Sequence, residues 1–210
     1  MGIFVTFEGP EGGGKTTQVQ LLARWLATAG YNVLTTREPG GTRIGDAVRA
    51  LLLDPAFTEM RSETEILLFS AARAQIVNER IKPHLEKGGV VLCDRFADST
   101  LAYQGYGRRL DLDTLRLITR FATGGLVPDL TICLDLPVVE GLRRKQGCDE
   151  AEWNRLERER QEFHERVRQG YRALSQTEPE RWLVLDAMEP VTQIQHEIRR
   201  RISERLETGV

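Results

Sequence analysis

The sequence predicts an α/β fold in which helices cover both faces of a parallel, five-stranded sheet. Two observations carry this prediction. Short β-branched or aromatic segments, typical of buried strands, alternate along the chain with amphipathic helical stretches. The apolar run at 90–94 is continuous, as in strands that are buried on both faces of a parallel sheet. We therefore expect a single three-layer α/β/α domain that spans residues 1–210.

Glycine and proline mark the element boundaries in the first part of the chain. A strand at 3–8 runs into glycines, and the amphipathic helix that follows it ends near Gly30. A strand at 31–36 then leads into a loop rich in proline and glycine. The next helix runs to about Leu53, where an Asp-Pro pair stops it.

A further helix is predicted to start at Ser62, because Glu65 follows three residues later and completes a capping-box pattern. Pro83 is expected to kink or end this helix. Farther on, the pattern predicts strands at 90–94, 130–135 and 182–186, helices at 96–106, at 111–123 and within 137–176, and a C-terminal helix.

Composition excludes several classes of protein. The chain has 210 residues and a formal net charge of −2, and 40% of its residues are hydrophobic. A chain of this length can bury a core without disulfides or a structural metal. No apolar run approaches the roughly 20 residues that span a bilayer, and neither a signal-peptide pattern nor a basic excess is present. We expect neither a membrane nor a nucleic acid as a partner.

The cysteines indicate a reducing compartment. Cys93 and Cys133 lie inside apolar, strand-like runs, Cys148 lies in a polar stretch, and no two cysteines form a C-x-x-C pair. A cysteine inside an apolar run behaves as a small hydrophobic residue. We expect a cytoplasmic protein without a structural zinc site.

One motif carries phosphate chemistry. The run at 9–16 fits the pattern G-x-x-x-x-G-K-[ST] and lies between a predicted strand and a predicted helix, as this motif requires. Its glycines let backbone N–H groups point at phosphate oxygens, and the helix start adds the positive end of its dipole. Lys15 is expected to hold the β- and γ-phosphates, and Thr16 to offer its hydroxyl to Mg²⁺. The residues predicted to bind ATP are Gly9, Pro10, Glu11, Gly12, Gly13, Gly14, Lys15, Thr16 and Thr17.

The rest of the sequence narrows the class of nucleotide-binding protein. GTPase switches read their base with Asn-Lys-x-Asp, which this chain lacks, and most motor ATPases and helicases are longer. Partitioning ATPases carry a second lysine near the start of the loop, where this chain has Pro10 and Glu11. Small-molecule kinases remain.

Two charged residues mark the acceptor side of the predicted site. Asp94 and Arg95 come at the carboxyl end of a buried strand, the edge of a parallel sheet where ligands bind. Asp94 can there reach Mg²⁺, directly or through water, and a guanidinium such as that of Arg95 can bind a phosphate through two hydrogen bonds. The pair predicts an acceptor that itself carries a phosphate, although a strand-end ion pair is the alternative.

Four motifs together resemble bacterial thymidylate kinase, a P-loop nucleoside monophosphate kinase. They are Phe-Glu-Gly-Pro-Glu-Gly-Gly-Gly-Lys-Thr-Thr (7–17), Arg-Glu-Pro-Gly-Gly-Thr (37–42), Ala-Ala-Arg-Ala-Gln (71–75) and Asp-Arg-Phe-Ala-Asp-Ser-Thr-Leu-Ala-Tyr-Gln-Gly (94–105). The resemblance implies a P-loop NTPase fold with a short helical lid and a homodimer. It also implies Mg²⁺-dependent phosphoryl transfer from ATP to dTMP, which yields dTDP for dTTP synthesis.

The resemblance also assigns residues to the acceptor. On spacing alone, Phe69 and Arg73 are better explained as a core phenylalanine beside a surface arginine. The resemblance implies instead that Phe69 stacks on thymine and that Arg73 donates to a thymine carbonyl. It implies that Arg95 holds the acceptor phosphate and that Tyr103 crowds the sugar 2′ position. The other residues that it places around the acceptor are Glu11, Glu38, Pro39, Ser99, Thr100 and Gln104.

A lid is expected at about 141–157. Some thymidylate kinases carry a catalytic arginine in the phosphate loop, where this chain has Gly12, so the resemblance implies an arginine from the lid. The sequence Asn-Arg-Leu-Glu at 154–157 resembles the family's Asp-Arg-apolar-Glu element, with Asn in place of Asp. This favours Arg155, with Arg144 next, although each also fits a solvated helix charge.

The predicted chemistry needs no general base, because an acceptor phosphate oxygen is already ionised at neutral pH. Catalysis then consists of positioning and charge neutralisation. The residues predicted to carry it are Lys15, Arg95, Arg155 and Arg144, with Thr16 and Asp94 at the metal.

Two rival functions remain open at this point. One is a kinase for a different nucleotide, and the other is a regulatory P-loop ATPase without a small acceptor.

The histidines offer no further chemistry, because all of them lie in helical stretches away from the motifs and are expected at the surface. They are His84, His164 and His196.

Overall fold

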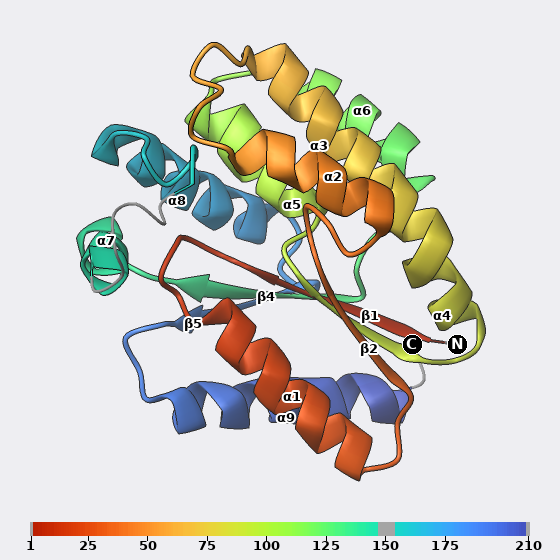
Figure 1. Cartoon of the computed structure of the whole chain (residues 1–210). Coiled ribbons are helices and arrows are strands. Elements are labelled where there is room, and N and C mark those ends of the chain that lie inside the picture. Colours follow the sequence, from red (N-terminus) through yellow and green to blue (C-terminus); the bar gives the residue numbers. More distant parts are fainter. Residues whose placement is uncertain (1, 147–153, 209–210) are drawn as a thin grey trace.

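A five-stranded, all-parallel sheet forms the middle layer of the protein, as the sequence predicts (Figure 1). This computed structural model describes residues 2–146 and 154–208. Across the sheet the strands follow the order β2-β3-β1-β4-β5. They are β1 (Ile3–Glu8), β2 (Val33–Arg37), β3 (Val90–Asp94), β4 (Leu130–Asp135) and β5 (Trp182–Asp186).

Helical connections bring the chain back to the same end of the sheet after each strand, which is why neighbouring strands run parallel. The helical elements are α1 (Lys15–Thr28), α2 (Arg43–Leu53), α3 (Ser62–Ile76), η1 (Val77–Ile81), α4 (Lys82–Glu86), α5 (Ala97–Thr100), η2 (Leu101–Gly107), α6 (Leu112–Thr123), α7 (Val138–Gln146), α8 (Gln161–Thr177) and α9 (Val191–Thr208).

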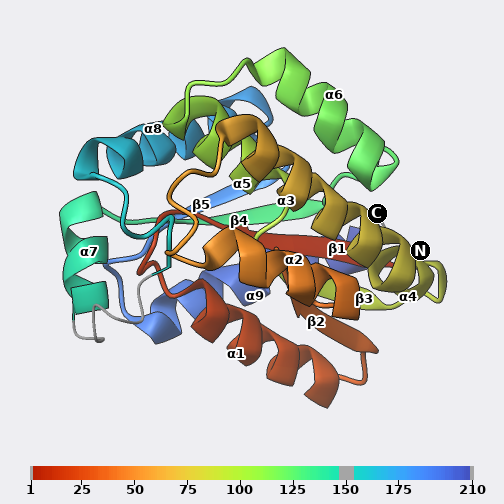
Figure 2. The same cartoon turned by 45° about the horizontal axis from the view of Figure 1, so that its top comes forward.

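Helices cover both faces of the sheet (Figure 2), and alternation along the strands divides the core into a layer on each face. Val5 of β1 belongs to the layer that contains Leu26 of α1 and Ile198 of α9. Phe4 belongs to the opposite layer, with residues of α3 and η1. Because the period of a strand is two residues, Glu8 points to the same side as Phe4.

The same alternation in β3 prepares the site. Leu92 packs in the layer of α1, and Cys93 packs in the opposite layer. Asp94 therefore turns toward α1, the helix that follows the phosphate loop. Cys93 and Cys133 are both buried, as the sequence predicts, whereas Cys148 lies outside the described residues.

The helix that begins at Ser62 does not end at Pro83. It continues through a π-helical turn, η1, into α4, and Pro83 lies in the first turn of α4. Proline has no N–H and its ring clashes with the carbonyl four residues earlier, so a local change of hydrogen-bond pattern before it accommodates the ring.

The chain between β4 and β5 contains the predicted lid. Helix α7 ends at Gln146 and α8 begins at Gln161, while part of the lid, 147–153, lies outside the described residues. In the described ranges, every helix is too short or too polar to span a bilayer.

Candidate active site

The phosphate loop joins β1 to α1 at the carboxyl edge of the sheet, and its glycines are required by its shape. Gly9, Gly12 and Gly14 all have positive φ angles, of 123°, 74° and 82°. At Gly9 a Cβ atom would also lie 2.4 Å from the carbonyl oxygen of Leu134. Both the backbone conformation and the close approach of β4 therefore exclude a side chain here.

Lys15, the first residue of α1, is buried beneath this loop. Its Nζ donates to the carbonyl oxygens of Gly9 (3.1 Å) and Pro10 (2.7 Å). Burial, and then the positive charge of Arg95, lower the pKa of Lys15 to about 8. An anion at the loop would stabilise the charged amine, so the site is electrostatically suited to phosphate.

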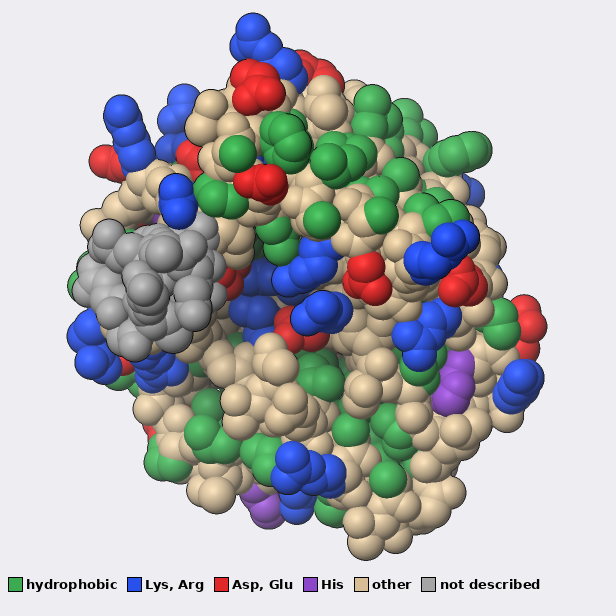
Figure 3. Space-filling view, viewed as in Figure 1, with side chains coloured by type: hydrophobic (Ala, Val, Ile, Leu, Met, Phe, Trp, Pro, Cys, Tyr) green, Lys and Arg blue, Asp and Glu red, His purple; other side chains and the backbone are tan. Residues whose placement is uncertain are grey.

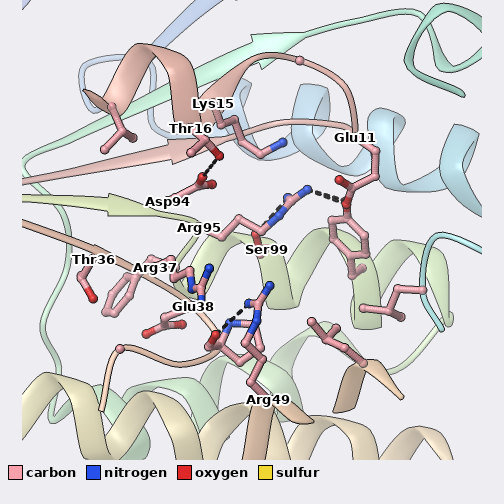
Figure 4. Close-up of a pocket in the computed structure, with 18 of the residues that line it drawn as sticks. Glu11, Lys15, Thr16, Thr36, Arg37, Glu38, Arg49, Asp94, Arg95 and Ser99 are labelled. Carbon is pink, nitrogen blue, oxygen red and sulfur yellow. Dashed lines mark hydrogen bonds and ion pairs between the residues drawn. The ribbon is translucent and has the colours of Figure 1, made fainter. Parts of the chain in front are cut away.

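Thr16 and Asp94 form an oxygen pair beside the loop (Figure 4). The hydroxyl of Thr16 donates to Asp94 Oδ2 over 2.6 Å. Hydroxyl and carboxylate oxygens are hard ligands of the kind that Mg²⁺ prefers, and Mg²⁺ bound with a nucleotide takes only one or two of its ligands from protein. In 2–146 and 154–208 no cluster of three or more His, Cys, Asp or Glu side chains offers a complete metal cage. This pair therefore fits Mg²⁺ that is held partly by phosphates.

Arg95 lies between the phosphate loop and α8. Its backbone has a φ of 68°, a left-handed conformation that is uncommon for a long side chain and tends to occur at functional sites. Nη2 donates to Glu11 (2.7 Å) and to the hydroxyl of Tyr103 (2.9 Å), and Nη1 donates to the hydroxyl of Tyr171 (3.0 Å) and the carbonyl of Gly9 (3.0 Å). These bonds fix the guanidinium at the mouth of the phosphate loop.

Glu8 supports Arg95 from below. Its carboxylate, which is fully buried, accepts from the backbone N–H of Phe96 (2.7 Å), the hydroxyl of Ser99 (2.5 Å) and the hydroxyl of Tyr171 (2.8 Å). Burial, with the negative charge of Asp98, raises the pKa of Glu8 to about 7. The hydroxyls that contact Arg95 thus rest on a buried carboxyl group whose pKa lies near neutral pH.

The far end of the pocket is built around Arg73, whose side chain is 1% exposed. Nε donates to Glu38 Oε2 (2.7 Å), Nη1 to the hydroxyl of Thr100 (2.9 Å) and Nη2 to the carbonyl of Phe96 (3.2 Å). Glu38 is joined to Pro39 by a cis peptide bond. A phenylalanine ring, an arginine and a buried carboxylate here offer one stacking surface and fixed polar groups.

One cavity of about 860 Å³ connects these parts, and Figure 3 shows Lys and Arg side chains gathered in its hollow. Its volume is in the range of small-molecule sites. Most of the residues that the sequence singles out line it, namely Glu11, Gly12, Gly13, Gly14, Lys15, Thr16, Thr17, Glu38, Pro39, Phe69, Arg73, Asp94, Arg95, Ser99, Thr100, Tyr103, Gln104 and Arg144. Gly9 and Pro10 reach the site through their carbonyl oxygens, whereas Arg155 is not part of the lining.

The two lid arginines occupy different places. Arg144 of α7 extends over the phosphate loop, where Nη1 donates to the carbonyl of Gly12 (3.3 Å). Arg155 lies away from the loop, with Nη2 2.5 Å from Glu65 Oε2 and Nε donating to the carbonyl of Leu52 (3.1 Å). The sequence favours Arg155, but only Arg144 lies beside the expected position of the phosphates.

Comparisons with known proteins agree on one family. A family model described as thymidylate kinase matches residues 7–198. The chain is 54% identical over 208 residues to the thymidylate kinase of Roseiflexus sp. (strain RS-1), covering 94% of this chain and 92% of that protein. It is 52% identical to that of Deinococcus radiodurans, covering 97% and 98%. The chain belongs to the thymidylate kinase family.

The fold agrees with this membership. The crystal structure of thymidylate kinase from Ehrlichia chaffeensis matches with a TM-score of 0.77 and 34% sequence identity, covering 96% of this chain and 98% of that one. The resemblance that the sequence motifs indicate is therefore confirmed at the level of family and fold.

Sequence reasoning missed several residues that a thymidylate kinase of this shape brings to its pocket. Arg37 and Arg49 line the cavity, and Arg49 donates to the carbonyl of Pro39 (2.8 Å) (Figure 4). Tyr171 reaches Arg95 from α8, 76 positions along the chain. Arg37 is the first residue of the 37–42 motif and could have been proposed from it. Arg49 and Tyr171 lie on amphipathic helices with no local signal.

Glu65 is the clearest correction to the sequence analysis. No capping box forms, because α3 is preceded by Arg61 without a side-chain cap, and Glu65 is buried. Its carboxylate accepts from Gln104 Nε2 (2.9 Å), Arg108 Nη2 (3.2 Å) and Arg155 Nη2. Burial favours the neutral acid, but the hydrogen bonds and charge of these partners outweigh it and lower the pKa of Glu65.

His164 also differs from expectation. It is 5% exposed, not a surface residue, and lies in α8 beside Phe163. Burial lowers the pKa of His164 and favours the neutral ring. Its Nε2 has no hydrogen-bond partner in the described parts of the chain.

Proposed function

We propose that this chain transfers the γ-phosphoryl group of ATP to the 5′-phosphate of dTMP, producing dTDP for dTTP synthesis. Membership of the thymidylate kinase family supports the reaction class. The observation that carries the proposal is that two cationic side chains, Lys15 and Arg95, meet at the phosphate loop, where both donate to the carbonyl oxygen of Gly9. Lys15 lies under the phosphate loop, and Arg95 is held 3.0 Å from the same loop's Gly9 carbonyl by Glu11 and two tyrosines.

The two cationic side chains then have separate roles. The loop with Lys15 binds the donor phosphates, and Arg95 orients the acceptor phosphate for in-line attack. Phe69 stacks on thymine, and Arg73 donates to a thymine carbonyl. Tyr103, fixed by its hydrogen bond to Glu11 (2.8 Å), borders the sugar.

Thr16 and Asp94 are the residues that would hold Mg²⁺, whose charge offsets that of the phosphates when it is bound. The lid arginine is Arg144. Its guanidinium already extends to Gly12, the loop position at which some family members carry their own arginine. Arg155 instead anchors the lid to the body of the protein through Glu65 and the end of α2.

A coupled assay of ADP release from Mg²⁺-ATP tests the proposal, with dTMP, dUMP, dCMP, dGMP, UMP and no acceptor run in parallel. We expect strong stimulation by dTMP. Stimulation by another nucleotide in place of dTMP would identify a kinase of different specificity. Slow hydrolysis that no acceptor stimulates would leave only a P-loop ATPase.

We further propose that the enzyme is a cytoplasmic homodimer joined through α2, α3 and α6. These helices carry exposed apolar side chains, and green side chains gather over them in Figure 3. The most exposed is Phe121, at 89%. The others are Ile44, Leu51, Leu67 and Leu117. Exposed apolar patches of this kind mark protein interfaces.

A further inference from the structure

A single buried carboxylate, that of Glu65, joins the base end of the pocket to the lid. Glu65 is 1% exposed and lies on α3. Oε1 accepts from Gln104 Nε2 (2.9 Å) and Arg108 Nε (3.3 Å), and Oε2 accepts from Arg108 Nη2 (3.2 Å) and Arg155 Nη2 (2.5 Å). Of these partners only Gln104 lines the cavity.

Two arginines keep this carboxylate ionised. An ionised carboxylate has acceptor oxygens and no proton to donate. The group of Gln104 that faces it must therefore be the NH₂ of the amide, because the carbonyl oxygen would meet another oxygen that carries negative charge. The amide of Gln104 is held in one of its two orientations by the charge of Glu65.

This orientation decides what Gln104 offers a ligand. One N–H of the NH₂ is committed to Glu65, and the carbonyl oxygen Oε1 is the acceptor that the amide offers to a base in the cavity. A carbonyl oxygen accepts and cannot donate. A base atom that meets this oxygen must therefore supply an N–H.

We propose that Glu65 is a positioning residue that determines base specificity, by fixing the Gln104 amide so that its carbonyl selects pyrimidine-2,4-diones. Thymine and uracil carry an N3–H donor, whereas N3 of neutral cytosine is an acceptor. Thymine at this position gains a hydrogen bond, and cytosine would face two acceptors directed at each other. Arg73 offers donors to the neighbouring carbonyl, so the two residues together match the pattern of the dione.

The inference deepens the proposed function and rests on it. The test uses the full chain with the substitution Glu65→Gln, which keeps the shape but can present either an oxygen or an NH₂ to Gln104. The amide of Gln104 is then free to turn. We measure kcat/KM for dTMP, dCMP and dUMP by ADP release.

The ratio of kcat/KM for dTMP over dCMP is expected to fall at least about tenfold, the effect of one reversed hydrogen bond in a dry site. The ratio for dTMP over dUMP is expected to stay within about twofold of wild type, because both bases carry the N3–H. A general loss of activity with both ratios unchanged would show that Glu65 is only structural and would overturn the inference.

Matched controls separate the charge cluster from the amide. Arg108→Gln and Arg155→Gln each remove one arginine from Glu65 but retain the acceptor for Gln104, so the dTMP over dCMP ratio should persist. A fall as large as that of Glu65→Gln would overturn the inference. If Glu65→Gln does not fold, the double variant Glu65→Gln/Arg108→Gln replaces it, because it removes one negative and one positive charge together. Its dTMP over dCMP ratio is compared with that of Arg108→Gln alone. If wild type is not stimulated by dTMP, the proposed function itself fails, which is a separate result.

Discussion

Glu8 is a buried carboxyl group beneath Arg95 whose pKa lies near neutral pH. It ends β1, immediately before the phosphate loop, and alternation turns it into the core beneath Arg95. Its carboxylate accepts the hydroxyls of Ser99 and Tyr171, both of which also contact Arg95. Burial nevertheless raises its pKa to about 7, so folding disfavours its ionised form.

We predict that Glu8→Gln gains stability relative to wild type as pH rises. Below the unfolded pKa of about 4.5 Glu8 is protonated in both states and costs nothing. Between 4.5 and 7 the unfolded chain releases this proton while the folded chain keeps it, so wild type loses stability. The difference should grow by about 3 kcal/mol across that window. Urea unfolding at several pH values measures it, and a difference independent of pH would contradict the prediction.

The lid arginines give a second prediction at this scale. Arg144→Ala should lower kcat by about 10³ or more, while KM for dTMP changes less than tenfold, because Arg144 lies over the loop and not at the acceptor. Arg155→Ala should have the smaller effect on kcat and should lower the free energy of unfolding, since Glu65 loses one of two cationic partners. Steady-state kinetics compare the two, and a larger loss of kcat for Arg155→Ala would restore the assignment that the sequence favours.

At the scale of elements, the start of α2 is stabilised by an N-cap, Thr42, which no prediction from the sequence included. Thr42 ends the Arg-Glu-Pro-Gly-Gly-Thr motif, and its hydroxyl accepts from the backbone N–H of Gly45 (3.0 Å). The cap satisfies one free donor at the helix start. It also fixes the helix that presents Arg49 to the cavity.

We predict that Thr42→Ala lowers the free energy of unfolding by about 1 kcal/mol, the usual contribution of such a cap. KM for dTMP should rise modestly, because α2 and Arg49 lose a fixed start. Thr42→Ser keeps the hydroxyl and is the matched control. Equal urea-unfolding curves for the alanine and wild-type proteins would show that the cap contributes nothing.

Helix α3 shows why a sequence pattern that is typical of a helix start can give a wrong prediction. Ser62 and Glu65 have capping-box spacing, yet Glu65 turns inward to Gln104, Arg108 and Arg155. A capping interaction stabilises a helix by about 1 kcal/mol. Removing a guanidinium partner from a buried carboxylate costs more than that, so the buried ion pairs determine where the Glu65 side chain lies. The three partners lie 39, 43 and 90 positions away, so no local pattern reveals them.

At the scale of the whole molecule, helices α2, α3 and α6 lie on the opposite side of the sheet from α1 and α9 (Figure 2), and they carry exposed apolar side chains. The cavity is lined by residues at the carboxyl ends of strands, such as Arg37 and Asp94, and helix α7 lies at this edge of the sheet, apart from α6 (Figure 1). We therefore expect a dimer that forms through α2, α3 and α6 to leave α7 uncovered.

We predict that Phe121→Glu shifts the protein toward monomer. Burying a phenylalanine contributes about 1.5–3 kcal/mol, so the dissociation constant should rise at least about tenfold, and more with an added buried charge. Sedimentation over a range of concentrations measures it. Val184→Glu, at a half-exposed position on β5 away from these helices, is the control. A wild-type protein that sediments as a monomer throughout would exclude the dimer.

The sequence by itself determined the fold class, the phosphate loop, the family and most of the pocket lining. These features depend on contiguous patterns, such as strand runs and the glycine-rich motif, whose residues act together where they stand in the chain. The tertiary structure alone decided which lid arginine reaches the loop, that Glu65 is a core residue and that Tyr171 supports Arg95. Each of these depends on how helices far apart in the chain pack across the sheet, and burial there changes the charge, partners and orientation that a side chain adopts.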